Sequence, residues 1–90
     1  MVDTIRGHVI YVVDGNTLDI EITHQEEGNK YQYNNGERIR IANIDKPELS
    51  SPYEKRSRDK LKNFVNGKEL LCYVQRRDSY NRVVADVRII

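Results

Sequence analysis

The sequence is poor in the residues that build covalent or metal frameworks. Its 90 residues include one cysteine, Cys72, and two histidines, His8 and His24. A single cysteine cannot close an internal disulfide, and this small set has no cysteine and histidine spacing typical of a zinc site. The sequence therefore excludes both disulfide and zinc frameworks.

Long apolar runs are missing as well. Apolar runs such as residues 12–13 and 70–72 are far shorter than the roughly 20 residues of a membrane helix. No leader-like segment precedes the first strand-like run, so we expect a cytoplasmic protein or an exported domain that has been trimmed. With 38% hydrophobic and 32% charged residues, the chain predicts one small domain over residues 1–90 and no membrane partner.

Charge divides unevenly between the two halves of the chain. The net charge is +1 overall, but residues 1–50 sum to −4 and residues 51–90 to +5. Acidic and basic groups side by side are typical of a site that binds a cation and a phosphate. Solvated charged surfaces give the same division, so composition leaves both interpretations open.

The first part of the sequence predicts a β-hairpin. Residues 4–13 are rich in β-branched and aromatic types and end at Asp14 and Gly15, a dipeptide that favours a tight turn. Residues 18–23 then alternate apolar and polar side chains, as a strand with one wet face does. Residues 24–36 are polar and turn-rich, which predicts a loop or an extended hairpin.

A third strand comes next. Ile39 and Ile41 share one of its faces, which places Arg38 and Arg40 together on the face away from the core. Pro47 ends this strand, because proline cannot donate a ladder hydrogen bond.

One helix is predicted over residues 52–66. Residues 51–54 have the pattern of a capping box with proline at the first helical position, and Gly67 marks the C-terminal cap. The side chains expected to form its apolar stripe are Ser57, Leu61, Phe64 and Val65. The rest of the helix is strongly basic, which is typical of a solvated outer face.

Two further strands are predicted over residues 70–75 and 83–87, with a turn at 77–81 between them. The resulting order has the helix between the third and fourth strands, as in the OB-fold, a five-stranded Greek-key β-barrel. We therefore expect a mainly β (α+β) domain with this fold.

Oxygen-bearing side chains fall where strands end. Asp14 and Asn16 flank the first turn, and Asp45 follows the third strand. Calcium takes about six to eight oxygen ligands in irregular geometry, so such residues suit it. Each one alone is more often a turn residue that bonds its own backbone.

Three other residues are candidates for phosphate chemistry. Arg40 and Arg82 can each donate two parallel hydrogen bonds to phosphate oxygens. Glu48 follows Pro47 in an irregular segment, where a carboxylate can take a proton from water. Taken singly, such arginines are more often surface ion-pair partners and such a glutamate is more often structural, so only the combination carries weight.

The combination resembles a known family. The segments VVDGNTLDI at 12–20, RIRIANIDKPE at 38–48 and QRRDSYNRVVADV at 75–87 are similar to three blocks of the staphylococcal nuclease-like (thermonuclease) family, in the same order. The resemblance covers essentially the whole chain. It implies an OB-fold and a calcium-dependent phosphodiesterase that cuts DNA and RNA and leaves 3'-phosphate ends, with single-stranded nucleic acid as the expected partner.

The resemblance also implies the ligands of the calcium ion. Asp14 and Asp45 would bind it together with the main-chain oxygen of Lys46, and Asn16 stands where the family usually has a third aspartate. A neutral amide at that position predicts weaker calcium binding.

The remaining roles follow from the same resemblance. Arg40 and Arg82 would grip the scissile phosphate, Glu48 would activate the attacking water, and Tyr80 would approach the bound nucleotide. Asn81 replaces a usual glycine, a mild change because asparagine tolerates positive φ.

Family members usually continue into two further helices after the fifth strand, so we expect exposed apolar barrel surface and low stability for residues 1–90 alone. The alternative to a nuclease is a non-catalytic OB module, or a fragment, that binds nucleic acid or protein. Tyr31, Tyr33 and Tyr80 are candidates for its base-stacking platform, although half-buried structural positions are the more ordinary role of such tyrosines.

Overall fold

The computed structural model describes residues 2–44 and 51–90, and their side chains except those of 51–54. Its elements, in chain order, are β1 (Asp3–Asp14), β2 (Thr17–Gln25), β3 (Gly36–Ile41), α1 (Ser51–Val65), β4 (Glu69–Arg77) and β5 (Val83–Ile89). Every predicted element is present. The main difference is length, because β1, β2, β4 and β5 each extend beyond the predicted limits.

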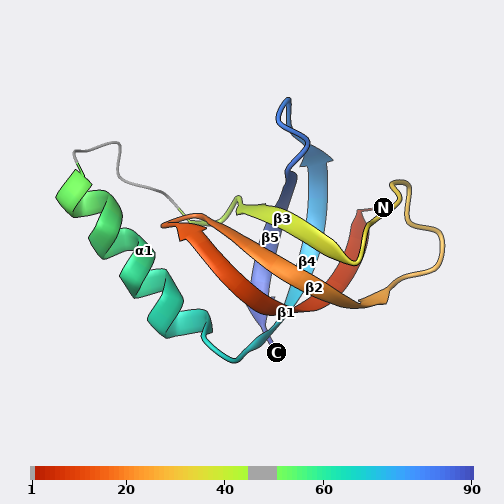
Figure 1. The fold of residues 1–90 in the computed structure, drawn as a ribbon. Coiled ribbons are helices and arrows are strands. Elements are labelled where there is room, and N and C mark those ends of the chain that lie inside the picture. The colour runs from red at the N-terminus through yellow and green to blue at the C-terminus, as the bar shows by residue number, and fades with distance from the viewer. Residues whose placement is uncertain (1, 45–50) are drawn as a thin grey trace.

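The strands close into a barrel in the order β1-β2-β3-β5-β4 (Figure 1). All neighbours are antiparallel except β3 and β5, which run parallel. Together with the helix between β3 and β4, this is the OB-fold that the element order predicts. The register of the parallel pair places the end of β3 beside the start of β5.

Alternation along the strands builds the core. In β3, Ile39 and Ile41 are buried whereas Arg38 is exposed and Arg40 is half-buried, as the period of two requires. The fully enclosed side chains from the strands include Ile5, Leu18, Ile20, Ile39, Leu70, Cys72 and Val83. Burial raises the pKa of the Cys72 thiol to about 12, so this cysteine acts as a small apolar core residue.

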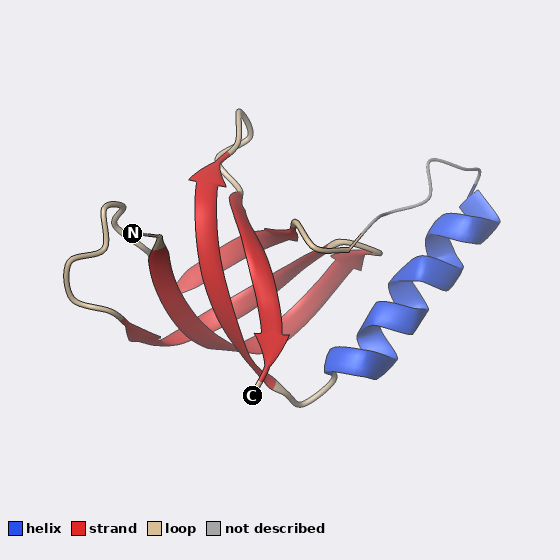
Figure 2. Ribbon diagram, turned by 180° about the vertical axis from the view of Figure 1, so that it is seen from behind, coloured by secondary structure: helices blue, strands red, loops and turns tan. Residues whose placement is uncertain are grey.

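Helix α1 lies at the side of the barrel and contacts β1 (Figure 2). Leu61 and Val65, one turn apart, are the buried side chains of its apolar stripe. Ser57 lies against Gly15, where an added Cβ would come within 2.5 Å of the Ser57 Cβ. The inclusion of Phe64 in the stripe is wrong, because this side chain is 69% exposed. The helix rests on the barrel through a narrow line of contact, and Phe64 lies on its flank.

The helix ends as the sequence predicts. The amide of Lys68 donates to the carbonyl of Val65 at 2.9 Å, and Gly67 has a φ of +70°, a left-handed conformation suited to glycine at a helix C-terminus. In the part of the chain that the structure describes, no helix is long and apolar enough to cross a membrane.

Candidate nucleic-acid and metal site

The β1–β2 turn carries the first predicted site residues. The Asp14 carboxylate accepts a hydrogen bond from the Asn16 backbone amide at 3.0 Å, and the Asn16 side-chain oxygen accepts one from the Thr17 hydroxyl at 2.9 Å. The Asn16 carbonyl accepts the Ile41 amide at 2.7 Å, which ties the turn to the end of β3. Both side chains are half-buried, so they are held in place while keeping access to solvent.

The two arginines of β3 differ in their surroundings. Arg38 makes a two-pronged ion pair with Asp19 on β2, with Nε and Nη2 donating at 2.8 and 3.1 Å. The hydrogen bonds to Asp19 raise the pKa of the Arg38 guanidinium above its ordinary value. The Arg40 side chain has no hydrogen bond or ion pair within the described parts of the chain. Of the two, it is therefore Arg40 whose guanidinium is not already paired with a described carboxylate and can turn all its donors to an anion.

The β4–β5 turn is organised by Asp78. Its Oδ1 accepts the backbone amides of Tyr80 and Arg82 at 2.9 Å each, and its Oδ2 accepts the Arg82 Nε at 2.6 Å. Burial raises the pKa of this carboxyl, but these hydrogen bonds from Arg82 and Tyr80 outweigh burial and hold it below its ordinary value. Asn81 adopts a φ of 63°, which confirms that asparagine serves the turn in place of glycine.

Arg82 and Tyr80 form one unit on this turn. The Arg82 guanidinium carbon lies 5.3 Å from the centre of the Tyr80 ring, and that ring is 79% exposed. Because Asp78 engages Arg82 through Nε, the two Nη groups remain as donors. The turn thus presents a cation and an aromatic face to solvent.

Strand register brings these parts together. Arg40 pairs with Thr17 across β2–β3 and with Val84 across β3–β5. The turn with Asp14 and Asn16 therefore lies on one side of Arg40, and Arg82, two residues before Val84, lies on the other. One edge of the barrel carries the oxygen-bearing side chains of this turn, two arginines and an exposed tyrosine.

Sequence reasoning missed the ion pair that supports this edge. Arg77 donates two hydrogen bonds to the Glu37 carboxylate at 2.9 and 3.2 Å, one to the Asn81 carbonyl at 3.1 Å and one to the Gln32 carbonyl at 3.0 Å. It thereby joins the β4–β5 turn to the β2–β3 loop. One signal was available, because Glu37 is in phase with the inward-facing Ile39 and needs a buried partner.

A second missed residue is Asp3 at the start of β1. Asp3 is only 6% exposed. Its carboxylate accepts hydrogen bonds from the amides of Lys30 and Tyr31 at 2.7 and 2.8 Å and from the Tyr33 hydroxyl at 2.8 Å. Tyr31 and Tyr33 are packed against the core by these contacts, so the structural role of both is confirmed. Among the three tyrosines proposed as a stacking platform, Tyr80 is the exposed one.

Three predicted site residues, Asp45, Lys46 and Glu48, lie outside the described residues. Within the described ranges, no group of three or more histidine, cysteine, aspartate or glutamate side chains is arranged to hold a metal ion. Of the expected calcium ligands, the structure describes the carboxylate of Asp14 and the amide oxygen of Asn16. Both are hard oxygen donors, so the chemistry of this set fits calcium.

The closed barrel with its helix between β3 and β4 defines the chain as an OB-fold domain. The model of the family described as staphylococcal nuclease homologue matches residues 38–90, more than half of the chain. The chain belongs to this family.

Curated relatives agree with this assignment. An uncharacterized endonuclease of Escherichia coli is 32% identical over 83 residues, which cover 92% of this chain and 48% of that protein. The probable endonuclease lcl3 of Pyrenophora tritici-repentis is 40% identical over 57 residues, covering 57% of this chain and 21% of its own. The probable staphylococcal-like nuclease CAN1 of Oryza sativa subsp. japonica is 44% identical over 50 residues, covering 56% and 15%. The chain therefore spans about half the length of the bacterial relative and less of the others.

Proposed function

We propose that this domain is a calcium-dependent nuclease that hydrolyses phosphodiester bonds of DNA or RNA. The observation that carries the proposal is the register of β2, β3 and β5, which brings Arg40 and Arg82 to one barrel edge beside the turn of Asp14 and Asn16. Membership in the staphylococcal nuclease homologue family and the names of the relatives, which describe endonucleases and a staphylococcal-like nuclease, support the same activity.

The calcium ligands in this proposal are Asp14, Asn16, Asp45 and the main-chain oxygen of Lys46. When bound, the ion offsets the negative charge of the phosphate and so favours attack by an anionic nucleophile. The chain's own part is to hold the first two ligands in position through the Asn16 amide and the Thr17 hydroxyl.

The two arginines act on the phosphate. Arg40 and Arg82 donate hydrogen bonds to its non-bridging oxygens, and these bonds strengthen as negative charge grows in the five-coordinate transition state. Asp78 keeps the Arg82 side chain aimed by holding Nε, while its Nη groups face the substrate. Glu48 takes the proton from the attacking water, and Tyr80 contacts the nucleotide with its exposed ring.

A second function, a non-catalytic OB module that binds single-stranded nucleic acid, is favoured by one observation. The Asn16 amide oxygen replaces a charged ligand and already accepts the Thr17 hydroxyl, which weakens it as a metal ligand. The Arg82 and Tyr80 pair then serves as a binding surface, where stacking on one aromatic ring contributes about 1–3 kcal/mol per base.

Arginine variants separate the two functions. Arg40→Ala and Arg82→Ala should each lower kcat about 100- to 1,000-fold, because a donor aimed at developing charge is lost, with a smaller effect on KM. Arg88→Ala is the matched control, since Arg88 is an exposed arginine of β5, the strand that follows Arg82, and lies outside the proposed site. Cleavage that is unchanged in both variants contradicts the assigned roles. Absence of cleavage in the wild type, with oligonucleotide binding that depends on Arg82, supports the binding module.

A further inference from the structure

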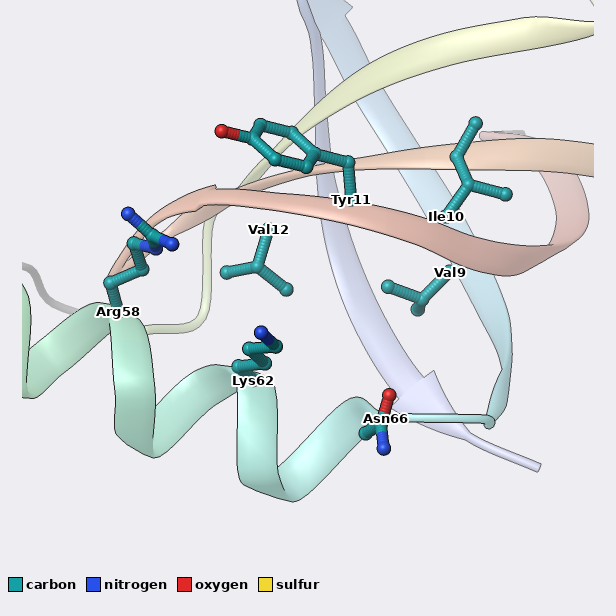
Figure 3. A pocket seen from close by; sticks show the side chains of 7 residues that line it. All are labelled: Val9, Ile10, Tyr11, Val12, Arg58, Lys62 and Asn66. Atoms are coloured by element: carbon teal, nitrogen blue, oxygen red, sulfur yellow. The ribbon is translucent and has the colours of Figure 1, made fainter.

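A groove lies between β1 and α1 (Figure 3). It encloses about 160 Å³ and is lined by residues 9–12 of β1 and by Arg58, Lys62 and Asn66 of α1. Figure 3 shows Val9 and Val12 directed toward the helix and Lys62 directed toward the strand. Val12 is buried and Val9 is half-buried against the core, so the floor of the groove is apolar and fixed.

The helix side of the groove is cationic. Arg58 and Lys62 are exposed, and the side chain of neither has an ion pair or hydrogen bond with another described side chain. They are four positions apart, so the two like charges lie on one face of α1 and repel each other. Among the residues that the structure describes, none that lines the groove is acidic. Such a surface is complementary to a polyanion.

The groove begins at the proposed site. Ser57, which directly precedes Arg58, packs against Gly15 in the β1–β2 turn. Asp14 and Asn16 flank that glycine, so the first cation of the groove lies near the predicted calcium ligands. From there the groove follows β1 and α1 away from the turn (Figure 3).

We propose that this groove binds the part of a single-stranded nucleic acid that extends beyond the cleaved phosphate. Arg58 and Lys62 contact phosphates of the strand, and their spacing of about 6 Å along the helix axis suits groups that follow one another on an extended chain. Val9 and Val12 contact the sugar or base between them. This inference rests on the proposed nuclease function and defines a longer substrate than the site alone would hold.

Charge-matched variants test the proposal. The groove variant is Arg58→Gln with Lys62→Gln, and the control is Lys55→Gln with Lys60→Gln, which removes two exposed charges of the same helix outside the groove. Binding is measured by fluorescence anisotropy in calcium for two probes, a nucleoside bisphosphate and a single strand of about 12 nucleotides, within the range of OB-fold site sizes. Glu48→Gln is used as the background so that the strand is not consumed.

We expect the groove variant to weaken binding of the long strand about tenfold or more. Its slope of log K against log salt should become shallower by about 1.4, since each lost phosphate contact on a single strand removes about 0.7. Affinity for the nucleoside bisphosphate should stay within about twofold, because the groove lies beyond the site. The control variant should keep the wild-type slope.

Five results would overturn the proposal. Equal losses in the groove and control variants would show only a general effect of net charge, and equal losses for both probes would place Arg58 and Lys62 in the cleavage site itself. A polyglutamate peptide that binds the groove as tightly as the strand would identify an acidic-protein surface instead. If wild type binds the bisphosphate but gains nothing from the longer strand, the groove proposal fails and the nuclease proposal stands, whereas wild type that binds neither probe contradicts both.

Discussion

Arg77→Met removes the ion pair with Glu37 and the hydrogen bonds by which Arg77 joins the β4–β5 turn to the β2–β3 loop. The side chains of Arg77 and Glu37 are only 16% and 5% exposed, so the substitution leaves the Glu37 carboxylate buried with the Asn34 amide as its one remaining described partner, at 2.8 Å. Breaking a buried pair from one side costs about 3–5 kcal/mol. A domain of this size is stable by about 5–13 kcal/mol, so the single variant should lose a large fraction of its free energy of unfolding.

Urea denaturation measures this cost. With a slope of about 1.5 kcal/mol per molar urea for a small domain, the midpoint should fall by about 2–3 M. Arg76→Met is the control, because Arg76 is exposed on the same strand and its replacement should change stability by less than about 0.5 kcal/mol. The double variant Glu37→Met with Arg77→Met should recover about 2 kcal/mol or more of the loss, since no unpaired charge remains buried.

The double variant also tests whether Glu37 and Arg77 stabilise the domain as a pair. Losses that add across Glu37→Met and Arg77→Met would mean that the two side chains do not act as a pair. A loss below about 1 kcal/mol for Arg77→Met would mean that water replaces its hydrogen bonds at little cost. Either result refutes a structural role for Arg77 in joining the two loops.

Three further predictions concern stability and metal binding. The pKa of Asp3 is raised by burial but lowered more by the hydrogen bonds it accepts. The contribution of Asp3 to the free energy of unfolding should therefore be present above the pKa of about 3.9 that aspartate has in the unfolded chain. It should be lost as the pH falls through the lower pKa of the folded state. Asp3→Asn should make the free energy of unfolding, measured by urea titration, less dependent on pH in this acid range. An unchanged pH dependence would contradict the stabilising role of the Asp3 carboxylate. Gly15→Ala should cost about 1–3 kcal/mol in the same assay, because the new Cβ meets Ser57 at 2.5 Å, and adding Ser57→Gly should return part of the loss; an unaltered midpoint would rule out the close packing. Asn16→Asp should tighten calcium binding by calorimetry by restoring a charged ligand, and equal or weaker affinity would remove Asn16 from the ligand set.

Much of the fold was predictable because local and tertiary preferences agree. The alternation in β3 gave the inward isoleucines and outward arginines, and Gly67 gave the helix end. Phe64 was misassigned because periodicity identifies an apolar stripe but not how wide the surface is that receives it.

The candidate site was predictable only in part. Strand ends and turn residues pointed to Asp14, Asn16 and Arg82, since chemistry-bearing residues concentrate in loops held by a rigid scaffold. The supports of these residues were not predictable: Asp3 and Arg77 act through loop carbonyls, amides and tyrosines about 30 residues away along the chain or more. Such contacts depend on the closed barrel and leave no local pattern in the sequence.

Cleavage of nucleic acid, compared in calcium and in EDTA, tests whether this domain is a calcium-dependent nuclease. The assay compares wild type with Glu48→Gln on single-stranded and duplex DNA, at about 10 mM calcium so that even a weak site with a Kd near 1 mM is filled. We predict cutting by wild type in calcium, none in EDTA, and a large loss of turnover in Glu48→Gln with nearly unchanged calcium affinity. Cutting that persists in EDTA, or equal turnover in the two proteins, would contradict this prediction.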